Sequence, residues 1–193
     1  MHHQKTFEII LALLSLVAHI LDARQNIWAR ILAYPVLCTN IYVYALRNLY
    51  GKVAHSVLGL LINSYAYVQW KGSASRAPIQ VTRTSRKVLL CASFLMVFGI
   101  GIWSFLASKY TPHPIRVVCF DACYFFVGLL EKWMMAHKKV ERWVIAFLRY
   151  TCLSIACYQA GSIILAILQF SLIIVSIYGQ LKWYKTCKNL QKL

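Results

Sequence analysis

Apolar residues occur along the chain in seven long blocks, separated by short polar or Pro/Gly-containing breaks. Blocks such as residues 88–98 lack the alternation of apolar and polar positions that the strands of a membrane barrel show, so they indicate helices. Several blocks approach or exceed the roughly 20 residues that a helix needs to cross a bilayer. The pattern predicts an all-α polytopic membrane protein with spans near residues 7–21, 27–46, 53–70, 87–108, 114–135, 141–159 and 162–183.

The composition supports this class and argues against two others. Of the 193 residues, 60% are hydrophobic and 13% are charged, about half the charged share of a soluble domain. The net charge is +16, but a mean hydropathy of +0.59 is too high for a nucleic-acid-binding protein, which needs polar surface. The seven cysteines form no CxxC pair and are expected to pack as small apolar side chains, so no metal or cofactor is predicted. No catalytic constellation or phosphate-binding loop indicates an enzyme or an ATP-driven step.

The cations are distributed unequally between the two sides of the predicted domain. Five fall on one side: Lys5, Arg47, Lys52, Lys109 and Arg116. Fifteen fall on the other: Arg24, Arg30, Lys71, Arg76, Arg83, Arg86, Lys87, Lys132, Lys138, Lys139, Arg142, Lys182, Lys185, Lys188 and Lys192. By the positive-inside rule, we expect the C-terminus in the cytoplasm and the N-terminus outside.

A basic loop at residues 71–86 divides this single membrane domain, 1–193, into related parts. Before it lies a first three-helix repeat, 7–70; after it come a linker helix, 87–108, and a second repeat, 114–183. Both repeats end in the pattern Tyr-small-x-x-x-Trp, at residues 65–70 and 178–183, and the same offset sets Ala23 against Ala136. We therefore predict a 3+1+3 arrangement of parallel repeats, a transporter architecture with the site near mid-membrane at the repeat interface.

Five ordered segments carry a resemblance to a known family. Residues 42–51 and 67–70 resemble the first half of the PnuC vitamin transporters, and residues 120–122, 134–143 and 178–183 resemble the second half. The resemblance covers residues 7–185. It implies a bacterial protein with the predicted fold, which is related in architecture to the SWEET sugar transporters. It implies facilitated diffusion of nicotinamide riboside, or of thiamine or riboflavin as in other branches. It also implies that a cytoplasmic vitamin kinase makes uptake one-way.

The resemblance implies a multi-pass protein of the bacterial inner membrane whose partners are the lipid bilayer, a small vitamin substrate and, as one possibility, further copies of the chain. A non-transporting structural membrane protein is the alternative from another class. Three positions depart from the nicotinamide riboside carriers: Ala146 stands where a second Trp is usual, Tyr150 where an Asn is usual, and Arg30 where an aromatic is usual.

Arg149 is the most informative residue, because a cation midway along a span costs at least about 2.5–3.5 kcal/mol on insertion scales. We expect it to face the bundle interior, with Asp121 as its partner in a structural clamp or, alternatively, in direct contact with substrate; a misplaced span boundary is the third alternative. Glu131 and Glu141 flank the loop between the fifth and sixth predicted spans and are expected to be solvated.

The remaining candidates for the substrate site are polar or aromatic. Trp143 is expected either in the interfacial belt or stacked on a planar vitamin ring, whereas Trp70 and Trp183 are expected in the belt. Tyr150 can supply a hydroxyl and a stacking face. The predicted substrate-binding residues are Trp143, Tyr150, Arg149, Asp121, Gln69, Asn40 and Asn63. For the amides of Asn40, Asn63 and Gln169, hydrogen bonding between helices is the alternative.

Overall fold

The computed structural model describes residues 2–46, 50–72, 80–110, 114–159 and 163–190, and these residues form seven α-helices and no β-strand. The helices are α1 (His2–Ala23), α2 (Trp28–Leu46), α3 (Tyr50–Lys71), α4 (Arg86–Ala107), α5 (Ile115–Ala136), α6 (Arg142–Gln159) and α7 (Ile163–Leu190). The all-helical class and the seven elements are thus confirmed. The largest differences from the predicted bounds are at the chain ends, where α1 begins earlier and α7 continues past residue 183.

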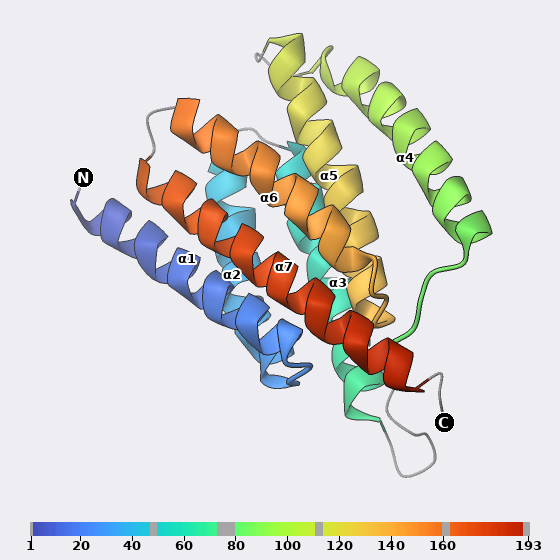
Figure 1. The fold of residues 1–193 in the computed structure, drawn as a ribbon. Helices are drawn as coiled ribbons and strands as arrows, with labels where there is room; N and C mark the ends of the chain where they lie inside the picture. The colour runs from blue at the N-terminus through green and yellow to red at the C-terminus, as the bar shows by residue number, and fades with distance from the viewer. Residues whose placement is uncertain (1, 47–49, 73–79, 111–113, 160–162, 191–193) are drawn as a thin grey trace.

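Six of the helices form a closed ring. Each packs on two neighbours in the order α1, α2, α3, α5, α6, α7 and back to α1. Helix α4 packs on α5 alone among the described elements, and Figure 1 shows it lying outside the ring. The helix between the two triplets therefore does not separate them in space, and α3 and α5 meet directly.

Three helical segments in the described residues are long and apolar enough, by length and composition, to cross a membrane: Trp28–Leu46, Arg86–Ala107 and Ala166–Leu190. The outlying α4 is the most apolar of these and the least buried, as expected for a helix surrounded by lipid. Helices α5 and α6 carry buried charges on their inner faces, at Glu131, Arg142 and Arg149, and these charges lower their mean hydropathy. The ring is thus apolar outside and charged within.

The turns that follow α1 and α5 have the same geometry at the same sequence offset. Gln25 has φ 58° and Lys138 has φ 47°, and these are the non-glycine residues with positive φ in the described chain. The amide of Asn26 donates to the Leu21 carbonyl at 2.9 Å, and its counterpart Lys139 donates to Met134 at 2.8 Å. The two turns therefore share a backbone conformation, although the sequences of the two triplets have low identity.

The paired tryptophans join the two triplets reciprocally at this end of the ring. Trp70 Nε1, on α3, donates to the Ala136 carbonyl at 3.3 Å, and Trp183 Nε1, on α7, donates to the Ala23 carbonyl at 3.2 Å. Both acceptors lie at helix C-termini, where the last carbonyls have no partner within the helix. Each triplet thus supplies an indole that satisfies a helix end of the other.

The tryptophans are core residues, and the predicted interfacial belt is wrong for them. Trp143 and Trp183 are fully buried and meet edge to face, with ring centroids 5.5 Å apart. Trp70 is 6% exposed and lies under the ammonium of Lys138, 4.7 Å from the ring centroid. Burial lowers the pKa of Lys138. We call these three rings the tryptophan cluster.

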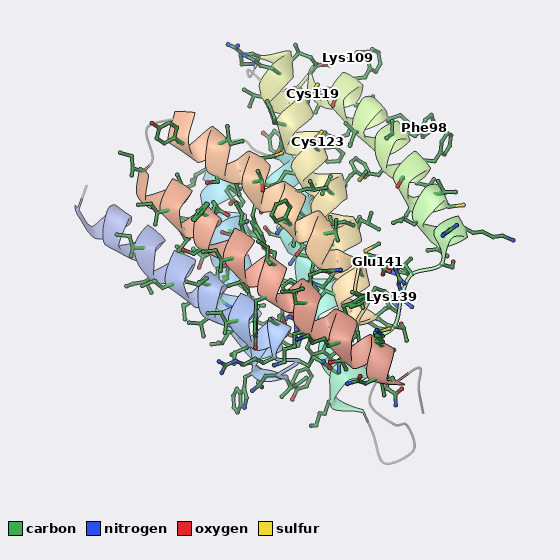
Figure 2. The ribbon with its side chains drawn as sticks, viewed as in Figure 1. Phe98, Lys109, Cys119, Cys123, Lys139 and Glu141 are labelled. Atoms are coloured by element: carbon green, nitrogen blue, oxygen red, sulfur yellow. The ribbon has the colours of Figure 1, made fainter. Side chains whose placement is uncertain are left out.

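The segment that leads into α4 is attached to the turn between α5 and α6. The Thr82 amide donates to the Lys138 carbonyl and the Thr82 carbonyl accepts from Val140, both at 3.1 Å. Glu141 accepts from the amide and the hydroxyl of Thr84, both at 2.9 Å. Figure 2 shows Lys139 and Glu141 at this end of the molecule and Lys109 at the opposite end. Glu141 is therefore an anchor for the chain before α4.

Candidate functional site

A cavity of about 270 Å³ lies inside the ring and is lined by all six of its helices. Its small residues, such as Ala12, Ala18 and Ala33, leave space between α1 and α2. Polar and charged side chains cover much of the rest: Ser15, His19, Asp22, Arg30, Asn40, Tyr44, His55, Asn63, Tyr124, Glu131, Lys132, Arg142, Arg149, Tyr150 and Gln169. A cavity with several converging polar groups is the usual form of a small-molecule site.

One carboxylate in the lining, Asp22 on α1, joins the two triplets. Its Oδ1 pairs with Nη2 of Arg30 on α2, and its Oδ2 lies 3.3 Å from Nη1 of Arg142 on α6. All three residues are at least 96% buried. The Arg30 guanidinium is also stacked over the Trp70 ring, 4.8 Å from its centroid. Asp22 therefore connects the cavity to the tryptophan cluster.

The second carboxylate, Glu131 on α5, holds Arg149. Arg149 Nη2 lies 2.9 Å from Glu131 Oε2, and Arg142 Nη2 lies 3.6 Å from Glu131 Oε1. The sequence prediction was right that Arg149 faces the interior beside an acid on α5, but the predicted partner was wrong. The prediction that Glu131 is solvated was also wrong, since the residue is 4% exposed.

Asp121 instead binds the beginning of α3. Its Oδ2 accepts from the Gly51 amide at 2.6 Å and its Oδ1 accepts from the Lys52 amide at 3.0 Å. The first amides of a helix have no intrahelical acceptor and carry a partial positive charge, so a carboxylate from α5 is well placed there. Asp121 is 8% exposed and does not line the cavity.

Tyr150 and the amides contribute neutral polar groups to the lining. The Tyr150 hydroxyl accepts from Arg149 Nη2 at 2.9 Å and bonds to His19 Nε2 across the cavity. Asn63 donates from Nδ2 to the Arg30 carbonyl at 2.7 Å and accepts from Arg30 Nη1 at 3.2 Å. Asn63 thus forms the interhelical bonds of the alternative hypothesis, while Asn40 and Gln169 also face the cavity.

The structure brings together Asn40, Asn63, Arg149 and Tyr150, but it places Asp121, Trp143 and Gln69 elsewhere. Trp143 lies in the tryptophan cluster, and Gln69 Nε2 donates to the Tyr65 hydroxyl at 2.8 Å. Sequence reasoning missed five ionic residues near the turns as parts of the site: it counted Arg30, Lys132 and Arg142 with the loop cations, expected Glu131 to be solvated, and did not single out Asp22. Their signal was an acid before and an arginine after each of the two turns: Asp22 and Arg30 flank the first, and Glu131 and Arg142 flank the second.

A ring of helices around a cavity lined by charged groups is compatible with a multi-pass membrane transporter. The family model for nicotinamide mononucleotide transporters matches residues 5–185. The chain belongs to this family, which places it among transporters and not among enzymes.

A solved structure shows the same fold. The crystal structure of the vitamin B3 transporter PnuC matches 93% of this chain and 82% of its own, with a TM-score of 0.67 and 18% sequence identity. None of the curated proteins matches the chain by sequence. The resemblance to PnuC proteins found in the sequence is thereby confirmed.

Proposed function

We propose that this protein carries a water-soluble vitamin or vitamin precursor with a planar ring across the bacterial inner membrane by facilitated diffusion. The single observation that carries the proposal is the cavity inside the ring of six helices, which is lined by charged and amide side chains. Charged and amide groups at membrane depth are costly, so an inert anchor would not need them. The family match and the likeness to a vitamin B3 transporter make compounds that contain a nicotinamide ring the first candidates.

The site that we propose combines aromatic walls with polar groups. Tyr44, Tyr124 and Tyr150 can face a planar ring, and Asn40 and Asn63 can exchange hydrogen bonds with its substituents. Arg149 presents its guanidinium to the same space.

Alternating access would work between two parallel three-helix repeats, α1–α3 and α5–α7, joined by α4. The matching turns at Gln25 and Lys138 and the reciprocal indole bonds support this arrangement. The Asp22–Arg142 ion pair and the tryptophan cluster cross between the repeats at the end that the charge distribution assigns to the cytoplasm. We propose that these contacts close the inner side of the cavity and separate when it opens inward.

Uptake into proteoliposomes without ATP or an ion gradient tests the proposal. Labelled nicotinamide compounds, thiamine and riboflavin are each added outside, and a saturable internal signal that equilibrates is expected for at least one. Protein-free liposomes provide the background. Absence of uptake and exchange for every compound would contradict a carrier and favour a non-transporting membrane protein.

A further inference from the structure

Charge is confined to one half of the cavity. The charged residues of the lining are Asp22, Arg30, Glu131, Lys132, Arg142 and Arg149. All lie close to the two matching turns, and the deepest, Arg149, is seven residues from the start of α6 at Arg142, or about 10 Å along the helix. With His55 counted as neutral, the described lining residues farther from the turns carry no charge. We call this part the neutral half; its residues are Ala12, Asn40, Tyr44, His55, Tyr124, Leu153, Leu168, Gln169 and Leu172.

The three amide side chains of the lining differ in their hydrogen bonds. Asn63 both donates to and accepts from Arg30. Gln169 Oε1, in contrast, is buried without a hydrogen-bond partner among the described residues, and the side chain of Asn40 forms no hydrogen bond within the described part of the chain. A buried amide oxygen without a donor is costly unless a ligand supplies one. The neutral half therefore offers two amides that a substrate can use.

These two amides lie at the same depth in the ring. Asn40 is six residues before the end of α2 at Leu46, and Gln169 is six residues after the start of α7 at Ile163. Both of these helix ends are opposite the tryptophan cluster. Helix α1 packs between α2 and α7 and presents the small side chain of Ala12 to the cavity. The amides thus flank a stretch of wall where a planar group has space.

The chemistry of Gln169 selects the kind of group that can bind there. Its Oε1 needs an N–H or O–H donor and its Nε2 needs an acceptor. A carboxamide or a cyclic imide presents an N–H beside a carbonyl oxygen and can satisfy both atoms at once, whereas a ketone or a carboxylate has no donor. Leu168 and Leu172 line the cavity on the same helix, and hydrogen bonds in such apolar surroundings are stronger than in water.

We propose that Gln169, with Asn40 on the other side of α1, forms a specificity-determining subsite for an uncharged carboxamide or imide group of the substrate. This inference rests on the proposed carrier function and adds which residues recognise which group. The ring that bears the group lies beside Tyr44 and Tyr124, and the rest of the molecule extends toward the charged half of the cavity.

Two pairs of compounds remove the N–H donor without a change of charge. In 3-acetylpyridine riboside a methyl group replaces the amide nitrogen of nicotinamide riboside, and in N3-methylriboflavin a methyl group replaces the imide hydrogen of riboflavin. Uptake into proteoliposomes is measured for all four. In the pair with the faster uptake, we expect the N–H compound to have a KM lower by about tenfold or more, because its partner leaves Gln169 Oε1 unpaired.

The identity of the faster pair distinguishes a carboxamide from an imide. Equal KM values within that pair would overturn the subsite while the carrier function stands. Uptake of thiamine alone, which has neither group, would overturn it as well. If neither these four compounds nor thiamine enters, the carrier proposal fails together with the subsite.

Variants at Gln169 provide the second arm. Gln169→Leu should raise the KM of the N–H compound by about tenfold and leave that of its methylated partner unchanged. Gln169→Met, which is closer in shape, gives the same test if the Leu variant lowers the folded yield. A preference that persists in these variants would show that the added methyl group is excluded by size, and an equal rise for both compounds would place the contact elsewhere on the substrate. Either result would contradict the proposal.

The matched control is Gln180→Leu. Gln180 is on the same helix, and its Oε1 is also buried without a hydrogen-bond partner among the described residues, but it does not line the cavity. This variant should keep the full preference for the N–H compound. Loss of the preference in Gln180→Leu as well would show that it does not depend on a contact inside the cavity, and the subsite would be overturned.

Discussion

The Arg149 guanidinium on α6 lies 2.9 Å from the Glu131 carboxylate on α5, and both side chains face the cavity. Glu131 also approaches Arg142, which forms a second ion pair with Asp22. The α5–α6 hairpin is therefore tied to α1 through an alternating series of acids and cations. Because each of Arg30, Arg142 and Arg149 has an acidic partner in this series, burying them in the membrane domain costs less free energy than burying unpaired charges.

Removing one member of the Arg149–Glu131 pair should destabilise the protein. Breaking a buried ion pair leaves an uncompensated charge, so Arg149→Leu and Glu131→Leu should each lower the free energy of unfolding by about 3 kcal/mol. The double variant should recover much of this loss, because both charges leave together. Thermal unfolding in detergent measures the effect, with Arg116→Leu, at an exposed position on α5, as the control. Additive losses in the double variant would show that the two side chains do not stabilise each other.

The partner of Arg149 could have been found from the sequence with one more step. Helices α5 and α6 follow each other across a short turn, so residues equally far from that turn lie side by side. Arg149 is about two turns into α6, Glu131 about one and a half turns from the end of α5, and Asp121 about four turns from it. The apolar blocks identified the helices, and the cost of a cation within a span indicated an acidic partner. Only the hairpin geometry shows which of the two acids lies at the depth of Arg149.

The tryptophan cluster could not have been predicted in the same way. A Trp near a lysine at the end of an apolar segment is typical of the membrane interface. Here Trp70 and Trp183 are buried because the C-termini of α1 and α5 offer unpaired carbonyls to their indoles. This pairing depends on how two triplets distant in the sequence meet. The offset that relates Ala23 to Ala136 was visible in the sequence, but nothing in it indicated that these carbonyls accept the indole bonds.

Loss of the indole donor should have similar effects at the two equivalent positions. Trp70→Phe and Trp183→Phe each remove one buried hydrogen bond, so each should lower the free energy of unfolding by about 1–2 kcal/mol. The control is Trp103→Phe, because Trp103 Nε1 has no hydrogen-bond partner among the described residues. A loss at one position with none at the other would contradict the reciprocal arrangement.

Asp121 should affect stability and leave substrate recognition unchanged. Asp121→Ala removes the acceptor for two amides at the start of α3, with an expected cost of about 1–2 kcal/mol. Asp121→Asn retains one acceptor oxygen and should cost less. Unfolding and uptake are measured on both variants. Normal stability with a raised KM would contradict the capping role and restore Asp121 as a substrate contact.

The orientation of the chain can be tested with an impermeant thiol reagent. Gln80→Cys, before α4, should react only from the cytoplasmic side, and Tyr110→Cys, after α4, only from outside, each in a variant lacking the exposed native cysteines and Cys187. The two sites are at opposite ends of α4 and serve as controls for each other. Reaction of Gln80→Cys from outside would reverse the orientation and show that the excess of cations does not mark the cytoplasmic side.

The central claim is that the substrate crosses through the cavity inside the ring. Equilibrium exchange in proteoliposomes, with Ala33→Trp beside Leu95→Trp, tests it most directly. Ala33 lines the cavity, whereas Leu95 is 65% exposed on the outer face of α4. With both variants folded as judged by thermal unfolding, we expect exchange to be abolished by Ala33→Trp and unchanged by Leu95→Trp. Normal exchange in a folded Ala33→Trp protein would contradict the account.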